Sequence, residues 1–355
     1  MMIRVVTSVS AYPFYNIRYV KLLEGISEKF STTVVAGTRL SGKVTIHRRY
    51  RVLHVLPFTV PRKIRYHIGP FFPRSLINLL NPDLIWLFDT ISQLFPILSS
   101  RPVILDIDDP HFSAKSWTKY MYYLHNRKIS KIVVPTGMIK ERFIKFYRLP
   151  KEKIVVIPSG VDLERFKPTP LPNEKIVLYY GTLAPHRSVF LLKIIEEVCN
   201  QDKEVKFIIL GDAPRFFTEY ILRNSLVDRV LMPGYVNHED LPSWLQMARV
   251  CLFPQDISLG GRFSVKLFEY MAAGRPIVAT DVDESWPVRE AGSGLVVPTD
   301  PKSYSSAVIE LLNDDELAKN LALRGVEYSR NYDWSLQISK YCNLIEELTS
   351  TTKKL

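Results

Sequence analysis

The segment Gly260–Gly274, GGRFSVKLFEYMAAG, joins a glycine pair to a short amphipathic helix. The glycines allow close backbone approach to a ligand, and a helix starting near Ser264 points its first N–H groups and positive dipole end at the same loop. On the helix, Lys266 and Glu269 share one face, with Phe268 on the other. The pattern predicts a phosphate near Lys266 and a ribose diol on Glu269. A surface Lys–Glu ion pair is the alternative.

Short apolar strands alternate with helical patterns on the N-terminal side of this segment and beyond it. Such βα alternation predicts parallel sheets covered by helices on both faces. In the first half, strands are expected at 3–6, 32–35, 84–88, 103–107, 131–134 and 154–157, with helices at 17–30, 116–129 and 138–147. In the second half, strands are expected at 176–180, 205–210, 230–232, 250–253, 277–279 and 295–297.

A stretch rich in proline and turn residues, Pro158–Pro170, interrupts the alternation near the middle of the chain. We interpret it as a linker between two domains, 1–165 and 171–330. Two domains also suit a chain of 355 residues, because a single core rarely grows that large. Ligands of doubly wound sheets bind at the carboxyl ends of the strands, so a cleft between the domains is the expected site.

The composition is that of an ordinary globular protein, with 46% hydrophobic and 23% charged residues. No stretch reaches the roughly 18 uninterrupted apolar residues that a transmembrane helix needs, and the N-terminus lacks a signal-peptide core. The three cysteines form no CxxC pattern, which favours a reducing compartment over disulfides or zinc. A cytoplasmic protein is expected.

Charge is unevenly distributed along the chain. Residues 1–170 carry a net charge of +16 and the remainder carries −5. Basic residues are interleaved with aromatic ones at 47–51 and 62–74, which suits an anionic membrane interface and a peripheral position on the cytoplasmic membrane face. Nucleic acid is a rival partner, but no helix-turn-helix, RRM, KH or zinc motif is present. A merely solvated basic face is the third interpretation.

The string K-L-x-E-Y-M-A-A-G-x-P-I-V-A-T resembles the signature of the large retaining glycosyltransferase group of the GT-B fold, called group 1 or family 4. Similar family stretches are IVVPTGMIKERFI…KIVVIPSGVDLERFKP, VLYYGTL and VLMPGYVNHEDLPSWLQMARVCLFP. The resemblance implies an α/β fold of two Rossmann-like doubly wound domains facing each other across a cleft. It also implies that the last helix, 333–350, crosses back onto the N-terminal, acceptor-side domain.

Donor-site roles follow from the resemblance, residue by residue. Glu269 would bind the donor ribose, and Lys266 and Arg187 its diphosphate. The implied donor-binding residues are Gly181, Thr182, Arg187, Tyr235, Val236, Gly261, Arg262, Phe263, Ser264, Val265, Lys266 and Glu269, with Tyr235 and Val236 at the base. The family's usual pattern has a second glutamate eight residues before Glu269, where this chain has Gly261, with Arg262 beside it. This departure leaves the identity of the sugar open.

On the acceptor side, the segment LDIDDPHF places Asp108 just past the predicted strand at 103–107. Many family members have a histidine there that is implicated in catalysis, so Asp108 is expected, with Arg187 and Lys266, to be catalytic. Asp106 and Asp108 also spell the DxD metal motif of the other main glycosyltransferase fold. The alternative is a structural role, in which the carboxylates cap the following turn. His111 is a weaker candidate for the catalytic role.

The expected enzyme moves a hexosyl unit from a nucleoside diphosphate sugar to a lipid-linked or polysaccharide acceptor. The resemblance implies retention of anomeric configuration and no metal or other cofactor, the activated sugar being a co-substrate. A nucleotide-sugar 2-epimerase or a glycan phosphorylase on the same fold is the second hypothesis. A non-catalytic basic protein that docks on membrane or RNA is the third.

Overall fold

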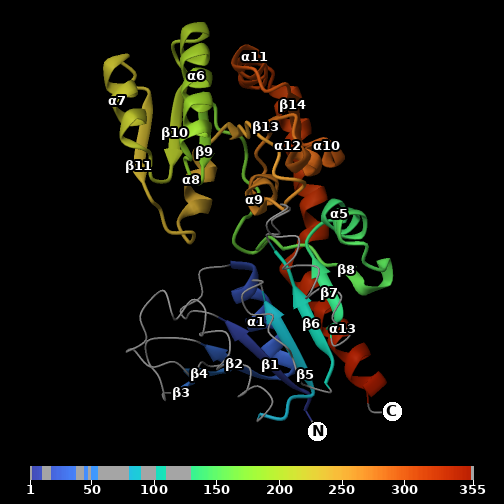
Figure 1. The fold of residues 1–355 in the computed structure, drawn as a ribbon. Coiled ribbons are helices and arrows are strands. Elements are labelled where there is room, and N and C mark those ends of the chain that lie inside the picture. Colours follow the sequence, from blue (N-terminus) through green and yellow to red (C-terminus); the bar gives the residue numbers. More distant parts are fainter. Residues whose placement is uncertain are drawn as a thin grey trace. The chain divides into compact units, whose positions relative to one another are not determined.

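The computed structural model describes residues 2–9, 17–36, 44–46, 49–54, 80–88, 101–108 and 129–352. The chain divides into two compact units, one formed by residues 1–159 together with 334–355, and the other by residues 160–333. Each unit is a sheet with helices packed against it (Figure 1). Within the described residues, no helix is both long enough and apolar enough to span a bilayer.

The first unit contains, among its described residues, an eight-stranded sheet with the order β3-β4-β2-β1-β5-β6-β7-β8. Its strands are parallel except for the antiparallel pair β3 and β4. The strands are β1 (Arg4–Val9), β2 (Ser31–Ala36), β3 (Val44–Ile46), β4 (Arg51–His54), β5 (Leu84–Phe88), β6 (Val103–Asp106), β7 (Ile129–Val134) and β8 (Ile154–Val156).

Helices of this unit come from both ends of the chain. Those in the described part of the unit are α1 (Ile17–Lys29), α5 (Gly137–Tyr147), the 3-10 turn η2 (Lys151–Lys153) and the C-terminal α13 (Trp334–Thr352). One face of α1 is buried with Trp86 and with Tyr341 of α13 in a single apolar cluster. Gly25 of α1 faces Ile338 of α13 so closely that a Cβ would collide, so glycine allows these two helices to approach.

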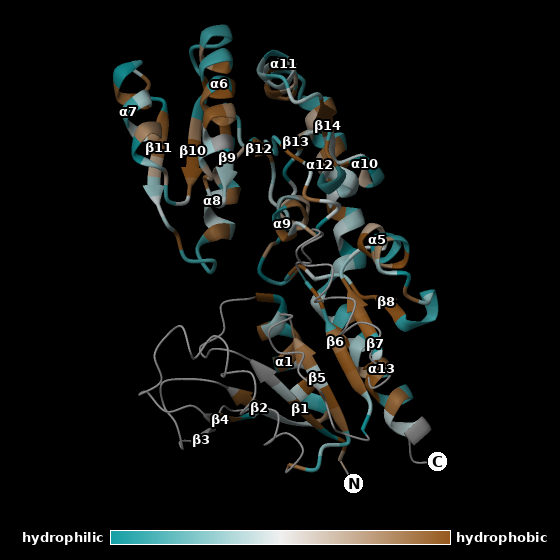
Figure 2. Cartoon of the chain, viewed as in Figure 1, coloured by the Kyte–Doolittle hydropathy of each residue, from teal (hydrophilic) through white to brown (hydrophobic). Residues whose placement is uncertain are grey.

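The second unit contains a six-stranded sheet with the order β11-β10-β9-β12-β13-β14, in which every pairing is parallel. Its strands are β9 (Ile176–Tyr180), β10 (Lys206–Leu210), β11 (Val230–Gly234), β12 (Val250–Phe253), β13 (Ile277–Thr280) and β14 (Gly294–Val297). Strands β5, β6 and β10 are strongly hydrophobic (Figure 2), as expected of strands covered on both faces.

Helices cover both faces of this second sheet. They are α6 (Pro185–Gln201), α7 (Arg215–Arg223), α8 (Leu241–Met247), α9 (Val265–Ala272), α10 (Trp286–Ala291), α11 (Pro301–Asn313) and α12 (Asp315–Ser329), with the 3-10 turns η3 (Asp283–Ser285) and η4 (Arg330–Tyr332). Residues of α6, α7 and α11 form the core on one face. Residues of α8, α9 and α10 form the core on the other.

The expected α/β class with parallel sheets is confirmed. The boundary between the two units, at Ser159 and Gly160, lies inside the predicted junction Pro158–Pro170. The rest of that segment belongs to the second unit, where Val161 and Phe166 are buried in the core. Ile129 begins strand β7 and does not end a helix. The rest of the predicted helix at 116–129, the basic segment at 62–74 and His111 lie outside the described residues.

Candidate functional site

Helix α9 presents the residues on which the sequence analysis centred. Ser264 precedes its first residue, and Gly274, in the left-handed region at φ 71°, follows it. The helix is buried nearly all round, from Leu267 to Ala272. Val265 and Lys266, in the first turn, are only partly buried, so Glu269 is the polar residue of α9 that lies in the protein interior.

Glu269 is the most buried charged residue of this helix, with 3% of its surface exposed. Its carboxyl oxygens accept hydrogen bonds from the Tyr180 hydroxyl and from His238 Nε2, the latter at 2.6 Å. Arg165 Nη1 lies 3.1 Å from His238 Nδ1. Because a guanidinium only donates, His238 accepts at Nδ1 and carries its proton on Nε2. Burial raises the pKa of Glu269 to about 8, while Arg165 acts in the opposite direction.

Lys266 turns toward the carboxyl end of strand β9. Its Nζ donates to the Tyr180 carbonyl at 2.8 Å and lies 5.1 and 5.3 Å from the ring centroids of Tyr179 and Tyr180. Burial and the neighbouring Arg187 lower the pKa of Lys266 to about 7. Gly181, at φ 133°, allows this approach, because a Cβ there would collide with Nζ.

Arg187 brings a second positive charge to the same place. It lies in the first turn of α6, where its Nη1 donates to the Thr182 carbonyl at 3.1 Å. Its Nε is buried and has no hydrogen-bond partner among the described residues. Among the described residues, neither Arg187 nor Lys266 forms a salt bridge with a carboxylate, and both donate to backbone carbonyls instead. Two adjacent cations without a carboxylate partner form a site for an anion.

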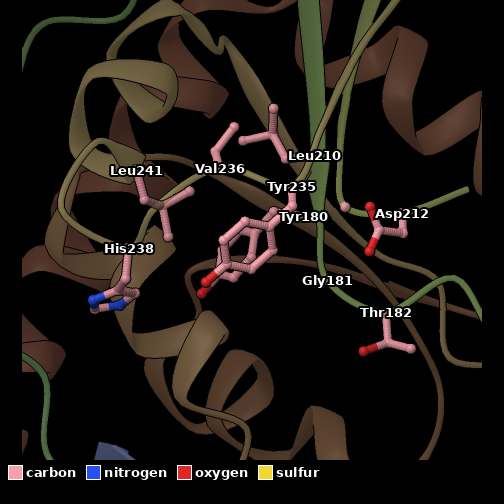
Figure 3. A pocket seen from close by; sticks show the side chains of 10 residues that line it. Tyr180, Gly181, Thr182, Leu210, Asp212, Tyr235, Val236, His238 and Leu241 are labelled. Atoms are coloured by element: carbon pink, nitrogen blue, oxygen red, sulfur yellow. The ribbon is translucent and has the colours of Figure 1, made fainter. Parts of the chain in front are cut away.

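A cavity of about 340 Å³ opens beside these residues, within the usual size range of small-molecule sites. It lies at the carboxyl ends of β9, β10 and β11, where doubly wound sheets bind ligands. The lining residues are Tyr180, Gly181, Thr182, Leu210, Gly211, Asp212, Tyr235, Val236, His238 and Leu241. His238 and Leu241 lie at one end, and Asp212 and Thr182 at the other (Figure 3).

Four residues that the sequence analysis assigned to the donor line this cavity: Gly181, Thr182, Tyr235 and Val236. The Tyr235 side chain is 75% exposed, so its ring is free to stack on a planar group. Glu269 is reached through His238 and the Tyr180 hydroxyl, which both line the cavity and bond the carboxylate. The cavity therefore has an apolar wall, a cationic edge and a buried carboxyl behind it.

The glycine loop before α9 is organised differently from the sequence expectation. Its backbone N–H groups at Leu259, Gly261 and Arg262 all donate to Oε1 of Glu284, at 2.9, 2.8 and 3.3 Å. Glu284, in η3, is 2% exposed. The Gly261 amide, which was expected to approach the donor, is therefore already paired with a carboxylate of this chain. Sequence reasoning did not single out Glu284, because no spacing rule connects it with this loop.

The remaining predicted loop residues fall into two groups. The ring of Phe263 stacks on Phe268, with ring centroids 4.5 Å apart and ring planes 4° from parallel, so it packs against α9. Ser264 makes no side-chain hydrogen bond to the helix start, which leaves the first N–H groups of α9 uncapped by it. Val265 is the first helical residue. The helix start, and not the Phe263 ring, is therefore the part of this segment suited to an anion.

In the first unit, Asp106, the last residue of β6, and Asp108, two residues beyond it, have different environments. Asp106 is fully buried and accepts hydrogen bonds from Arg18 Nε and Nη2 at 3.3 and 3.2 Å, and from the Tyr341 hydroxyl. The Asp108 side chain is 23% exposed and lies 3.9 Å from Arg18 Nε. Asp106 is thus occupied by Arg18, which disfavours the DxD metal hypothesis. Among the described residues, no group of three potential metal ligands occurs.

Comparison with protein families gives two matches. Residues 21–165 match Glycosyltransferase Family 4, and residues 174–314 match Glycosyl transferases group 1. The two matches occupy the first and second structural units in turn, apart from a few residues at the junction. The second match contains Arg187, Lys266 and Glu269.

Curated relatives match parts of the chain. An α-D-kanosaminyltransferase of Streptomyces kanamyceticus is 30% identical over 157 residues, which cover 43% of this chain and 40% of the relative. A phosphatidyl-myo-inositol mannosyltransferase of Mycobacterium leprae is 29% identical over 213 residues, covering 57% and 55%. The chain thus spans about half the length of the curated relatives it matches.

Solved structures match nearly the whole chain. Sucrose-phosphate synthase from Thermosynechococcus elongatus superposes with a TM-score of 0.79 at 17% identity, covering 98% of this chain and all of that one. The Anabaena HepE protein, solved with UDP and glucose, gives a TM-score of 0.75 at 17% identity with the same coverage. At these identities the likeness establishes the fold.

Proposed function

This chain belongs to the glycosyltransferase family with the GT-B fold, and we propose that it transfers a sugar from a nucleoside diphosphate sugar to a lipid-linked or polysaccharide acceptor, with retention of anomeric configuration. The observation that carries the proposal is the arrangement in the second unit. Two cations without carboxylate partners, Lys266 and Arg187, stand beside a cavity that leads to the buried carboxyl of Glu269. Diphosphate, base and ribose each find a chemically matched surface there.

Donor binding in this proposal divides among three parts of the site. The base lies in the cavity against Tyr235 and Val236, and the ribose hydroxyls replace the Tyr180 hydroxyl as hydrogen-bond donors to Glu269. The diphosphate lies near Lys266 and Arg187. HepE, solved with UDP and glucose, supports a nucleotide and a sugar as ligands of this fold.

The reaction requires stabilisation of the departing diphosphate. The bond from the sugar C1 to the phosphate oxygen breaks, and the acceptor oxygen bonds to C1 on the same face. The acceptor proton passes to the leaving diphosphate. Lys266 and Arg187 lower the free energy of the charge that develops on the leaving group, and each charge-assisted contact is worth about 1.5–3 kcal/mol. These two positive charges replace a metal ion in the proposal, and Asp108 orients the acceptor hydroxyl.

The acceptor belongs to the first unit in this account. The phosphatidyl-myo-inositol mannosyltransferase relative is named for a lipid substrate, which supports a lipid-linked acceptor. The net charge of +16 in residues 1–170 supports docking of this half on an anionic cytoplasmic membrane surface, where each basic residue contributes about 1 kcal/mol.

Product analysis tests the proposal. The protein is incubated with a panel of nucleoside diphosphate sugars and glycan or lipid-linked acceptors, and glycosidic product is measured by mass spectrometry. Glu269→Ala should lower donor-dependent turnover at least about 100-fold, since two hydrogen bonds to a charged group are lost. Glu219→Ala, which removes an exposed carboxylate of the same unit, serves as the control and should retain full activity. Unchanged turnover in Glu269→Ala, or free epimerised sugar nucleotide as the sole product, contradicts the proposal.

A further inference from the structure

His238 has no role so far in the proposed reaction, although it lines the cavity. With Leu241 it forms one end of that cavity (Figure 3), and its side chain is 34% exposed. Its Nε2 donates to Glu269 Oε1 at 2.6 Å. His238 therefore connects the surface of the cavity with the buried carboxyl behind it.

Arg165 fixes which ring nitrogen of His238 carries the proton. Its Nη1 lies 3.1 Å from Nδ1, and a guanidinium has no acceptor, so Nδ1 accepts and Nε2 keeps the proton. Arg165 is itself held by Asp162, whose Oδ1 accepts the Arg165 backbone N–H at 3.1 Å and whose Oδ2 lies 3.9 Å from Arg165 Nε. A chain of contacts thus runs from Asp162 through Arg165 and His238 to Glu269.

The ring of His238 is also fixed by packing. The Phe166 ring, which is 1% exposed, lies beside it, with the ring centroids 5.5 Å apart and the ring planes tilted by 59°. A ring that is packed on its side and hydrogen-bonded at both nitrogens has little freedom left to lose when it orients a neighbouring group. His238 is therefore preorganised to hold Oε1 of Glu269.

The two carboxyl oxygens of Glu269 are held differently. Oε1 is bonded by His238, whereas Oε2 accepts from the hydroxyl of Tyr180, which also lines the cavity. Rotation of the Tyr180 side chain would uncover Oε2, while the contacts of His238 to Arg165 and Phe166 keep Oε1 in place. Arg165 also lowers the pKa of Glu269 against the larger effect of burial, which favours the ionised form that accepts hydroxyl groups.

We propose that His238, supported by Arg165, is a positioning residue that orients Glu269 toward the ribose, and that it thereby sets the preference of the protein for ribonucleotides over deoxynucleotides. The inference rests on the proposed function, in which Glu269 accepts the ribose hydroxyls. A fixed carboxylate gains two hydrogen bonds from a vicinal diol and none from a dideoxyribose. A carboxylate that is free to turn loses part of that advantage to the entropy of being ordered.

Variants of His238 separate positioning from packing. His238→Phe keeps a planar ring but removes both nitrogens, so Glu269 Oε1 loses this donor. His238→Gln is the conservative variant, because its amide NH2 group can donate in place of Nε2. Arg165→Met removes the group that fixes the proton on Nε2. The control is Tyr220→Phe, which removes a hydrogen bond to another carboxylate of the same unit, that of Glu196.

Calorimetry measures the affinity for a nucleoside diphosphate and for its 2′,3′-dideoxy counterpart, the base being whichever of UDP, GDP and ADP the wild type binds most tightly. We expect the wild type to prefer the ribonucleotide by at least about 100-fold, as two hydrogen bonds to a charged group allow. His238→Phe should reduce this preference about tenfold and leave the affinity for the dideoxynucleotide unchanged. Arg165→Met should reduce the preference by a smaller factor, whereas His238→Gln and Tyr220→Phe should keep it.

A preference that stays at the wild-type level in His238→Phe would overturn the inference. An equal loss of affinity for both nucleotides would also overturn it, because His238 would then support the cavity or contact the base without acting through Glu269. A wild type that binds both nucleotides equally well would show that Glu269 accepts no ribose hydroxyl. A wild type that binds neither contradicts the proposed function itself.

Discussion

Donor binding should depend on pH through two groups with displaced pKa values. Lys266, with a pKa of about 7, must be charged to hold the diphosphate, and Glu269, with a pKa of about 8, must be ionised to accept the ribose hydroxyls. Binding therefore weakens as the pH rises through 7, because Lys266 loses its proton. It also weakens as the pH falls through 8, because Glu269 gains one.

The magnitude follows from the two titrations. The fraction of protein with Lys266 charged and Glu269 ionised is greatest near pH 7.5, at about 6%. It is about 20-fold lower at pH 5.5 and about 6-fold lower at pH 9.0, so the affinity should fall by these factors. The probe for this measurement is a nucleoside diphosphate sugar. It is chosen because neither of its phosphates titrates between pH 5.5 and 9.0, so the ligand adds no pH dependence of its own.

Calorimetry between pH 5.5 and 9.0 measures the profile in the wild type and in two variants. Glu269→Gln should remove the acid limb and leave the alkaline one. Lys266→Met should weaken binding throughout and remove the alkaline limb. A flat wild-type profile would refute the reasoning, as would limbs that persist unchanged in both variants, since the titrating groups would then be others.

Two further predictions concern stability. Gly181→Ala places a Cβ against Lys266 Nζ at φ 133° and should destabilise the protein by about 1–3 kcal/mol in urea unfolding. Gly137→Ala is the control, because its Cβ meets open space, and an equal loss in both would contradict the explanation. Arg18→Met leaves Asp106 buried without its cation and should cost about 3–5 kcal/mol. Combining it with Asp106→Asn should recover part of that loss; a single-variant cost below about 1 kcal/mol would contradict the role of the pair.

Most strands of both sheets could be predicted, because a strand that is buried on both faces consists of consecutive apolar residues. The strand β5 and the strand β9 match their predicted bounds, 84–88 and 176–180. The short strands β3 and β4 were missed, since their sequences, VTI and RVLH, mix polar with apolar residues and form no continuous apolar run. The junction between the units could be predicted from the proline and turn residues at 158–170, but the burial of Val161 and Phe166 could not, because those turn residues surround them.

In the site, the positions of residues on the same helix could be predicted from their spacing. The contacts between residues far apart in the sequence could not. Lys266 and Glu269 are three residues apart on one helix, so their shared face follows from helix geometry. His238 bonds Glu269 across 31 residues and Glu284 bonds Gly261 across 23. No periodicity relates such partners; only the packing of α8, α9 and η3 onto the sheet brings them together.

A crystal structure of the protein with a nucleoside diphosphate tests the central claim most directly. The account predicts the diphosphate within hydrogen-bond distance of Lys266 and Arg187, the base against Tyr235, and the ribose hydroxyls on Glu269 in place of the Tyr180 hydroxyl. A diphosphate bound away from Lys266 and Arg187, or a Glu269 carboxylate that keeps both of its present partners in the complex, would contradict it.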